Sequence, residues 1–70
     1  MGRIPGINSQ RAIRAFERAG FQIIRQSGHV VMWDGTRTIV IPRNNPIAPV
    51  TMFKIAQAAG LTPEQFRELL

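Results

Sequence analysis

The stretch FQIIRQSGHVVMWDGTRTIVI, residues 21–41, contains three short runs of β-forming residues separated by turn signals. We expect strands over residues 21–26, 29–33 and 36–41. Ser27-Gly28 and Asp34-Gly35 are predicted as two-residue hairpin turns, because glycine adopts the positive φ that such turns need. The stretch therefore predicts a three-stranded antiparallel meander, which ends where Pro42 has no N–H to donate.

Apolar residues at helical spacing precede this sheet, over residues 10–20. Asn8 or Ser9 is a suitable N-cap, since either side chain can accept from an unpaired N–H group of the first turn. Gly20 fits the left-handed position that follows a helix. We therefore predict a first helix that ends immediately before the first strand.

Two more helices are predicted after the sheet, over residues 50–60 and 63–70. Thr62 and Gln65 have the spacing of a capping box, with a proline at the first helical position between them. A proline-rich loop connects the sheet to these helices, and residues 1–7 are predicted as an irregular arm. The predicted fold is one α+β domain over residues 1–70, in the order α-β-β-β-α with a short C-terminal helix, and with helices on one face of the sheet.

The predicted turns also assign the strand residues to two faces, because alternate residues of a strand point in opposite directions. Under this pairing Ile24 lies opposite Val31, and Trp33 lies opposite Thr36. The better core face carries Phe21, Ile23, Arg25, Val30, Met32, Arg37, Ile39 and Ile41. The face predicted to stay open carries Gln22, Ile24, Gln26, His29, Val31, Trp33, Thr36, Thr38 and Val40.

Composition excludes several classes of chemistry. The 70 residues include no cysteine, one histidine and four carboxylates, so we expect no disulfide, no thiolate chemistry, no metal site and no cofactor. The absence of cysteine fits a cytoplasmic protein. No apolar run approaches the length of a membrane span and no signal-peptide core follows Met1, so we expect no membrane association.

The charge is strongly basic. Nine basic residues, eight of them arginine, against four acidic ones give a net charge of +5. The planar arginine fork matches phosphate and carboxylate groups, which indicates a nucleic acid or an acidic protein as partner. The alternative interpretation is ordinary solubilising surface charge.

His29 and Trp33 are the two distinctive side chains of the predicted open face. Imidazole exchanges protons between about pH 5 and 8, so His29 is a candidate acid–base group, and the alternative is a polar residue that merely begins a strand. An exposed Trp33 can stack on a base or anchor a protein partner. Its alternative is partial burial under a loop.

The sequence resembles the HicA toxin family over nearly its whole length. The resemblance rests on the order and spacing of five short stretches: A-G-F at 19–21, R-Q-S-G-H at 25–29, D-G-T-R at 34–37, I-P-R at 41–43 and A-G-L-T-P-E-Q-F at 59–66. It implies a fold similar to the double-stranded-RNA-binding domain. It also implies an mRNA interferase, a bacterial endoribonuclease toxin that a HicB antitoxin neutralises.

Family members have a catalytic histidine in a Gly-His or Gly-Ser-His stretch at the second strand, which corresponds here to His29. The serine precedes the glycine in this chain, so a role for Ser27 does not carry over. We predict RNA contacts by Arg25 and Arg43, then by Arg37 and Lys54. The second helix has only this one lysine, so readout of a long RNA duplex is not predicted.

Trp33 and Val31 are predicted to contact the antitoxin. Three functions fit the sequence: a histidine-dependent RNase toxin, a non-catalytic RNA-binding module, and a protein-interaction module with an acidic partner.

Overall fold

The computed structural model of the protein describes residues 6–70, so most of the arm predicted at the start of the chain lies outside the described residues. Six elements follow one another: α1 (Ser9–Arg18), β1 (Gln22–Arg25), β2 (Val30–Trp33), β3 (Thr38–Ile41), α2 (Pro49–Ala58) and α3 (Pro63–Glu68). The strands form one antiparallel sheet in the order β1-β2-β3. The predicted α+β class and element order are therefore confirmed.

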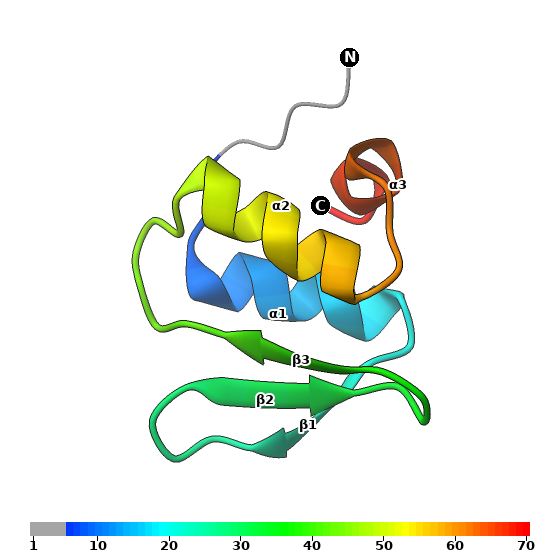
Figure 1. Ribbon diagram of the computed structural model, residues 1–70. Helices are drawn as coiled ribbons and strands as arrows, with labels where there is room; N and C mark the ends of the chain where they lie inside the picture. Colours follow the sequence, from blue (N-terminus) through cyan, green and yellow to red (C-terminus); the bar gives the residue numbers. More distant parts are fainter. Residues whose placement is uncertain (1–5) are drawn as a thin grey trace.

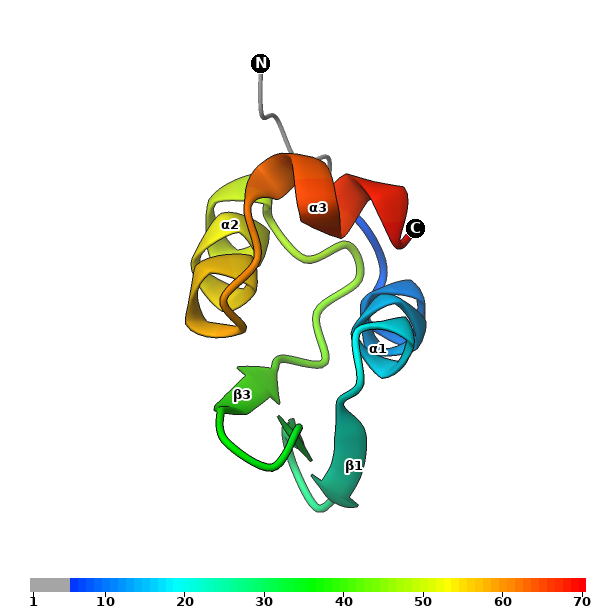
Figure 2. The same ribbon diagram turned by 90° about the vertical axis from the view of Figure 1, so that its right-hand side faces the viewer.

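The elements form layers (Figures 1 and 2). α1 and α2 both lie over one face of the sheet, with the segment from β3 to α2 running between them in Figure 2, and α3 lies on the side of these helices that is turned away from the strands. An isolated bridge joins Ile7 to Ile47, so the chain before α1 lies beside the chain before α2. Within residues 6–70, no helix lies over the other face of the sheet.

The turn between α1 and β1 is a Schellman motif. Asn8 caps the start of α1 by accepting from the Arg11 N–H. At the end of the helix, the Phe21 N–H donates to the Phe16 carbonyl at 3.0 Å, and Gly20 adopts a φ of 100°. A residue with a Cβ would be strained at that φ, and this explains why position 20 is a glycine.

β1 and β2 pair as predicted only at Gln22 and Ile23, where β1 begins. Gln22 lies opposite Trp33, but a β-bulge follows, so Arg25 rather than Ile24 lies opposite Val31. The predicted Ile24–Val31 pair is therefore wrong. The extra residue of the bulge also moves Arg25 from the predicted core face to the face of Val31, since directly opposed residues share a face.

The β2–β3 connection is longer than predicted. Trp33 pairs with Thr38, so residues 34–37 form a four-residue loop instead of a two-residue turn at Asp34-Gly35. The Asp34 carboxylate accepts from the N–H groups of Thr36 at 2.9 Å and Arg37 at 2.6 Å. These two bonds satisfy backbone donors that a tight turn would have paired with backbone. The error is two residues, so the assignment of Thr38–Ile41 to the two faces survives. Thr36 and Arg37 lie in the loop instead of the strand, and Arg37, predicted on the core face, is exposed.

The core lies between the sheet and the helices, as predicted. It contains Val30 and Met32 of β2, and Ile39 and Ile41 of β3, all exposed by no more than 4%. They pack with buried residues from the helices and loops, which include Phe16, Phe21, Ile47, Met52 and Phe66. The predicted capping box of Thr62 and Gln65 is present at the start of α3.

We predict that Asp34→Ala lowers the melting temperature at neutral pH, and that this difference disappears only as the pH falls through the lowered pKa of Asp34. The N–H of Arg37, and after it that of Thr36, lower the pKa of Asp34 from its ordinary value of 3.8. Because the pKa is lower in the folded state, the ionised carboxylate stabilises the fold above 3.8, and this stability is lost as the pH falls through the lowered pKa.

Thermal unfolding of parent and variant across this pH range measures the effect, with Glu17→Ala on the exposed surface of α1 as a control. A difference in melting temperature that persists unchanged at low pH would contradict the electrostatic explanation.

Candidate functional site

His29 lies in the four-residue loop that joins β1 to β2, directly before Val30, the first residue of β2. The predictions of a two-residue turn at Ser27-Gly28 and of a strand that begins with His29 on the open face are wrong, because the pairing of β1 with β2 stops at Arg25 and Val31. Its exposure is confirmed. Val30 beside it is buried and pairs with Ile41, so the imidazole is attached to a firmly held point of the sheet.

Arg43 fixes the backbone of this loop. Its Nε donates to the Gly28 carbonyl, and its Nη2 donates to the Gln26 carbonyl at 2.5 Å. One guanidinium therefore holds the two carbonyls that flank Ser27, immediately before His29. Gly28 contributes a φ of 78°, which favours glycine at this bend.

The segment that carries Arg43 is itself held in place. Asn45 accepts from the Ser9 N–H at 2.9 Å, which ties the loop after β3 to the first turn of α1. Ile47, further along the same loop, is fully buried. The backbone of Arg43 thus belongs to an anchored segment. The two hydrogen bonds of Arg43 connect the His29 loop to that segment.

Arg25 lies on the open face, next to the loop in sequence. The bulge places it opposite Val31, and its side chain is exposed. The sequence prediction missed this position because strict alternation assigns Arg25 to the core face. A cationic side chain is thereby exposed at the end of β1, where the chain enters the His29 loop.

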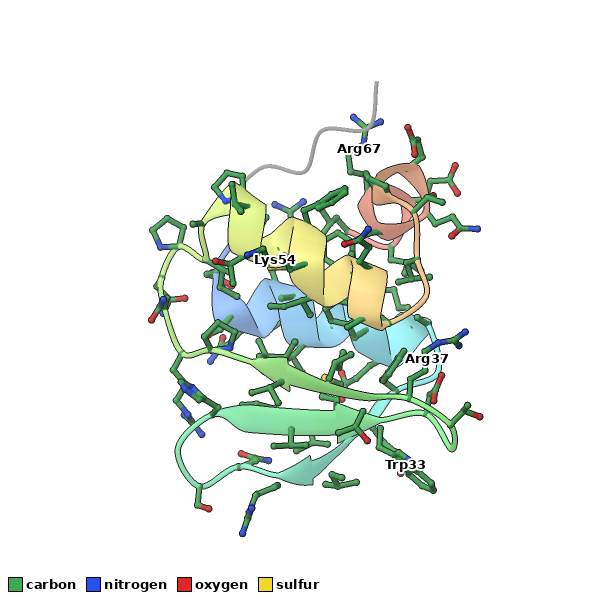
Figure 3. All side chains as sticks on the ribbon, viewed as in Figure 1. Trp33, Arg37, Lys54 and Arg67 are labelled. Atoms are coloured by element: carbon green, nitrogen blue, oxygen red, sulfur yellow. The ribbon has the colours of Figure 1, made fainter. Side chains whose placement is uncertain are left out.

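The structure does not bring Arg37 and Lys54 to this loop. Arg37 lies in the β2–β3 loop, at the opposite end of the sheet from the β1–β2 loop (Figures 1 and 3). Its guanidinium lies against Gly60, where an added Cβ would be 2.8 Å from the Arg37 Cζ. Lys54 is exposed on α2, in the helical layer (Figure 3).

The open face of the sheet carries an apolar patch. Trp33, Ile24 and Val40 are 39%, 56% and 47% exposed, and Val31 among them is half-buried. Figure 3 shows Trp33 pointing away from the helices. Exposed apolar side chains gathered on one face make this a candidate contact surface for a partner.

The described residues also limit other chemistry. Among residues 6–70, no three His, Cys, Asp or Glu side chains are grouped so that they could hold a metal ion. None of the helices in this part of the chain is long and apolar enough to cross a membrane.

Comparison with known proteins agrees with these features. The family model described as HicA toxin of bacterial toxin-antitoxin matches residues 9–61, which extend from the start of α1 to just beyond α2 and include the His29 loop. The chain belongs to the HicA toxin family. Comparisons with curated proteins and with solved structures gave no match. Membership makes this chain a toxin of a toxin–antitoxin system, with an antitoxin as its partner.

Sequence reasoning missed one feature of this HicA-family chain. Arg11, Arg14 and Arg18 line a groove of about 270 Å³ together with Asn8, Gln10 and Leu70. The spacing of the arginines at i, i+3 and i+7 was visible in the sequence as the polar side of the first helix. That Leu70 forms part of the same groove depends on how α3 packs, which no local pattern reveals.

We predict that Arg43→Ala loosens the His29 loop while the fold remains intact. Two hydrogen bonds from an exposed guanidinium are lost, so we expect the free energy of unfolding to fall by only about 1 kcal/mol. Backbone NMR order parameters of residues 26–29 should fall from about 0.85 to below about 0.6.

Arg43→Lys keeps the charge but not the planar fork, so it should loosen the loop almost as much. Order parameters that stay at the parent value in both variants would show that Arg43 does not hold the loop.

Proposed function

We propose that this chain is an mRNA endoribonuclease, the toxin of its toxin–antitoxin pair, and that it cleaves RNA without a metal ion. The observation that carries the proposal is an exposed imidazole on a loop whose carbonyls are held by Arg43. Acid–base catalysis needs a group that titrates near neutral pH and is held where substrate can reach it. An mRNA substrate implies action in the cytoplasm.

RNA supplies its own nucleophile for this reaction. His29 removes the proton of a 2′-hydroxyl, the 2′-oxygen forms a bond to phosphorus, and the bond from phosphorus to the 5′-oxygen breaks. The 5′-oxygen leaves with a proton, so the products carry a 2′,3′-cyclic phosphate and a 5′-hydroxyl. That second proton comes from the imidazolium, from water or from the RNA itself.

Arg43 and Arg25 are the proposed electrostatic groups. A guanidinium has five N–H donors, and Arg43 uses two of them on the loop, which leaves three for a phosphate oxygen. Its first task is thus to position His29, and its second is to stabilise the phosphorane charge. Arg25 adds positive charge from the open face, whereas Arg37 and Lys54 remain candidates for contacts with more distant parts of the RNA.

A HicB-like antitoxin is the proposed partner of the open face. The exposed ring of Trp33 and the adjacent Val31 provide the aromatic and aliphatic surface on which protein interfaces commonly depend. The two alternative functions, RNA binding without cleavage and protein interaction alone, differ from this proposal in whether RNA is cut.

The test is cleavage of a single-stranded RNA by purified protein in excess chelator. We expect the parent to produce cyclic phosphate ends and His29→Ala to produce them at a rate lower by about 10²-fold or more. The exposed imidazole leaves no cavity, so the melting temperature and the RNA affinity should hardly change.

Arg67→Ala on α3 serves as a control for surface substitution and should cut RNA like the parent. A strict magnesium requirement, 3′-hydroxyl ends, or parental activity in His29→Ala would each contradict the mechanism. RNA binding without cleavage by the parent would favour the non-catalytic alternative.

We predict that Trp33→Ala weakens antitoxin binding by about 2 kcal/mol or more. Phe53→Ala is a matched control, because Phe53 is 40% exposed against 39% for Trp33 but lies on α2 rather than on the sheet. Titration calorimetry with the antitoxin measures both variants. The surface assignment would be wrong if Phe53→Ala had the larger effect, or if Trp33→Ala only lowered the melting temperature of the free toxin.

A further inference from the structure

The α1 groove, defined above by Arg11, Arg14 and Arg18 with Asn8, Gln10 and Leu70, lies apart from the His29 loop. Seven residues of helix separate the first arginine from the last, which is about 10 Å along the axis. The groove therefore presents three guanidinium groups in a row, on a scale that suits several consecutive charges of an extended ligand.

Hydrogen-bond donors dominate this groove. The side-chain oxygen Oδ1 of Asn8 accepts from the Arg11 N–H, so the side-chain NH₂ of Asn8 is left for a ligand. The first turn of α1 contains no acidic residue, and no carboxylate side chain lines the groove. Three guanidinium groups with no carboxylate side chain among them favour an anionic ligand.

One wall of the groove is fixed in position. Arg18 Nη1 donates to the Leu69 carbonyl at 2.5 Å, which ties the chain after α3 to the last turn of α1. Leu70 is half-buried beside it. Arg11 and Arg14 are exposed and lie toward the opposite end of the groove, so they are available to a ligand.

The position of the groove relates it to the His29 loop. A tight turn joins α1 to β1, so the two elements run in opposite directions, and the start of α1 lies at the same end of the molecule as the β1–β2 loop (Figure 1). A strand that follows the arginines from Arg18 to Arg11 therefore leaves the groove toward the end of the protein where His29 lies.

From these observations we infer that the α1 groove binds the sugar–phosphate backbone of the RNA whose cleavage is proposed above. The bidentate arginine fork matches phosphate, and a row of three along one helix matches a repeating anion. The inference rests on the proposed function for the identity of the ligand. The groove holds the strand, and the chemistry takes place at His29.

The experiment measures the affinity for a single-stranded 2′-O-methyl oligonucleotide, which lacks the nucleophilic hydroxyl and cannot be cut. Arg11→Gln/Arg14→Gln should weaken binding about ten-fold. It should also reduce the slope of log affinity against log salt by about 1.4, since each lost contact with a single strand contributes about 0.7. Arg67→Gln, which removes an exposed arginine outside the groove, should bind like the parent.

Arg11→Lys/Arg14→Lys keeps the charge and guards against a folding defect in the glutamine variant, and it should bind with the parental salt slope. Parental affinity in the glutamine variant would overturn the inference. So would a poly-glutamate peptide that binds the groove as tightly as the oligonucleotide, because this would assign it to an acidic protein segment. Failure of the parent to cut ordinary RNA, together with the predicted loss of oligonucleotide binding, would reject the catalytic proposal and leave the groove assignment standing.

Discussion

The packing of the Phe16 ring against Phe21 and Phe66 is the interaction on which the arrangement of the layers depends. The ring is fully buried, and its centroid lies 5.9 Å from that of Phe21 and 5.0 Å from that of Phe66. The backbone carbonyl of Phe16 accepts from the Phe21 N–H in the turn that follows α1, so Phe16 also fixes the position of Phe21, the first residue after the turn. The direction in which the chain enters β1, and hence the face that β1 turns to the helices, follows from this one cluster.

Burial of one sheet face leaves the other available for function. Met32 and Ile39 are 0% and 2% exposed, whereas Trp33 and Val40, each one residue further along, are 39% and 47% exposed. Within each of these four-residue strands, alternate side chains therefore belong to the buried face and to the exposed face of the sheet. The catalytic candidate lies on neither surface, because His29 belongs to a loop whose shape depends on Arg43 rather than on strand pairing.

The sequence predicted the parts of this fold that depend on local chemistry. The caps of α1 and α3, the glycine after α1 and the burial of the apolar residues of β2 and β3 on the core face follow from side-chain type and spacing, and these are confirmed. The β-bulge at Arg25 was not predictable, since it depends on how β1 and β2 fit together over the core. Arg43 was predicted as an RNA contact, but its bonds to the loop carbonyls require a tertiary contact across at least 15 residues of sequence, which no local pattern reveals.

The distance between Trp33 and His29 bears on how an antitoxin could silence such a toxin. Four residues of extended chain separate them, which is about 13 Å. A standard protein interface covers about 800 Å² of each partner, a patch considerably wider than that separation. A partner centred on Trp33 would therefore exclude RNA from the loop without touching the imidazole. The α1 groove belongs to the helical layer on the other side of the sheet, so it would stay outside such a patch. Occlusion of His29, rather than displacement of RNA from the arginines, is then the physically simpler route to neutralisation.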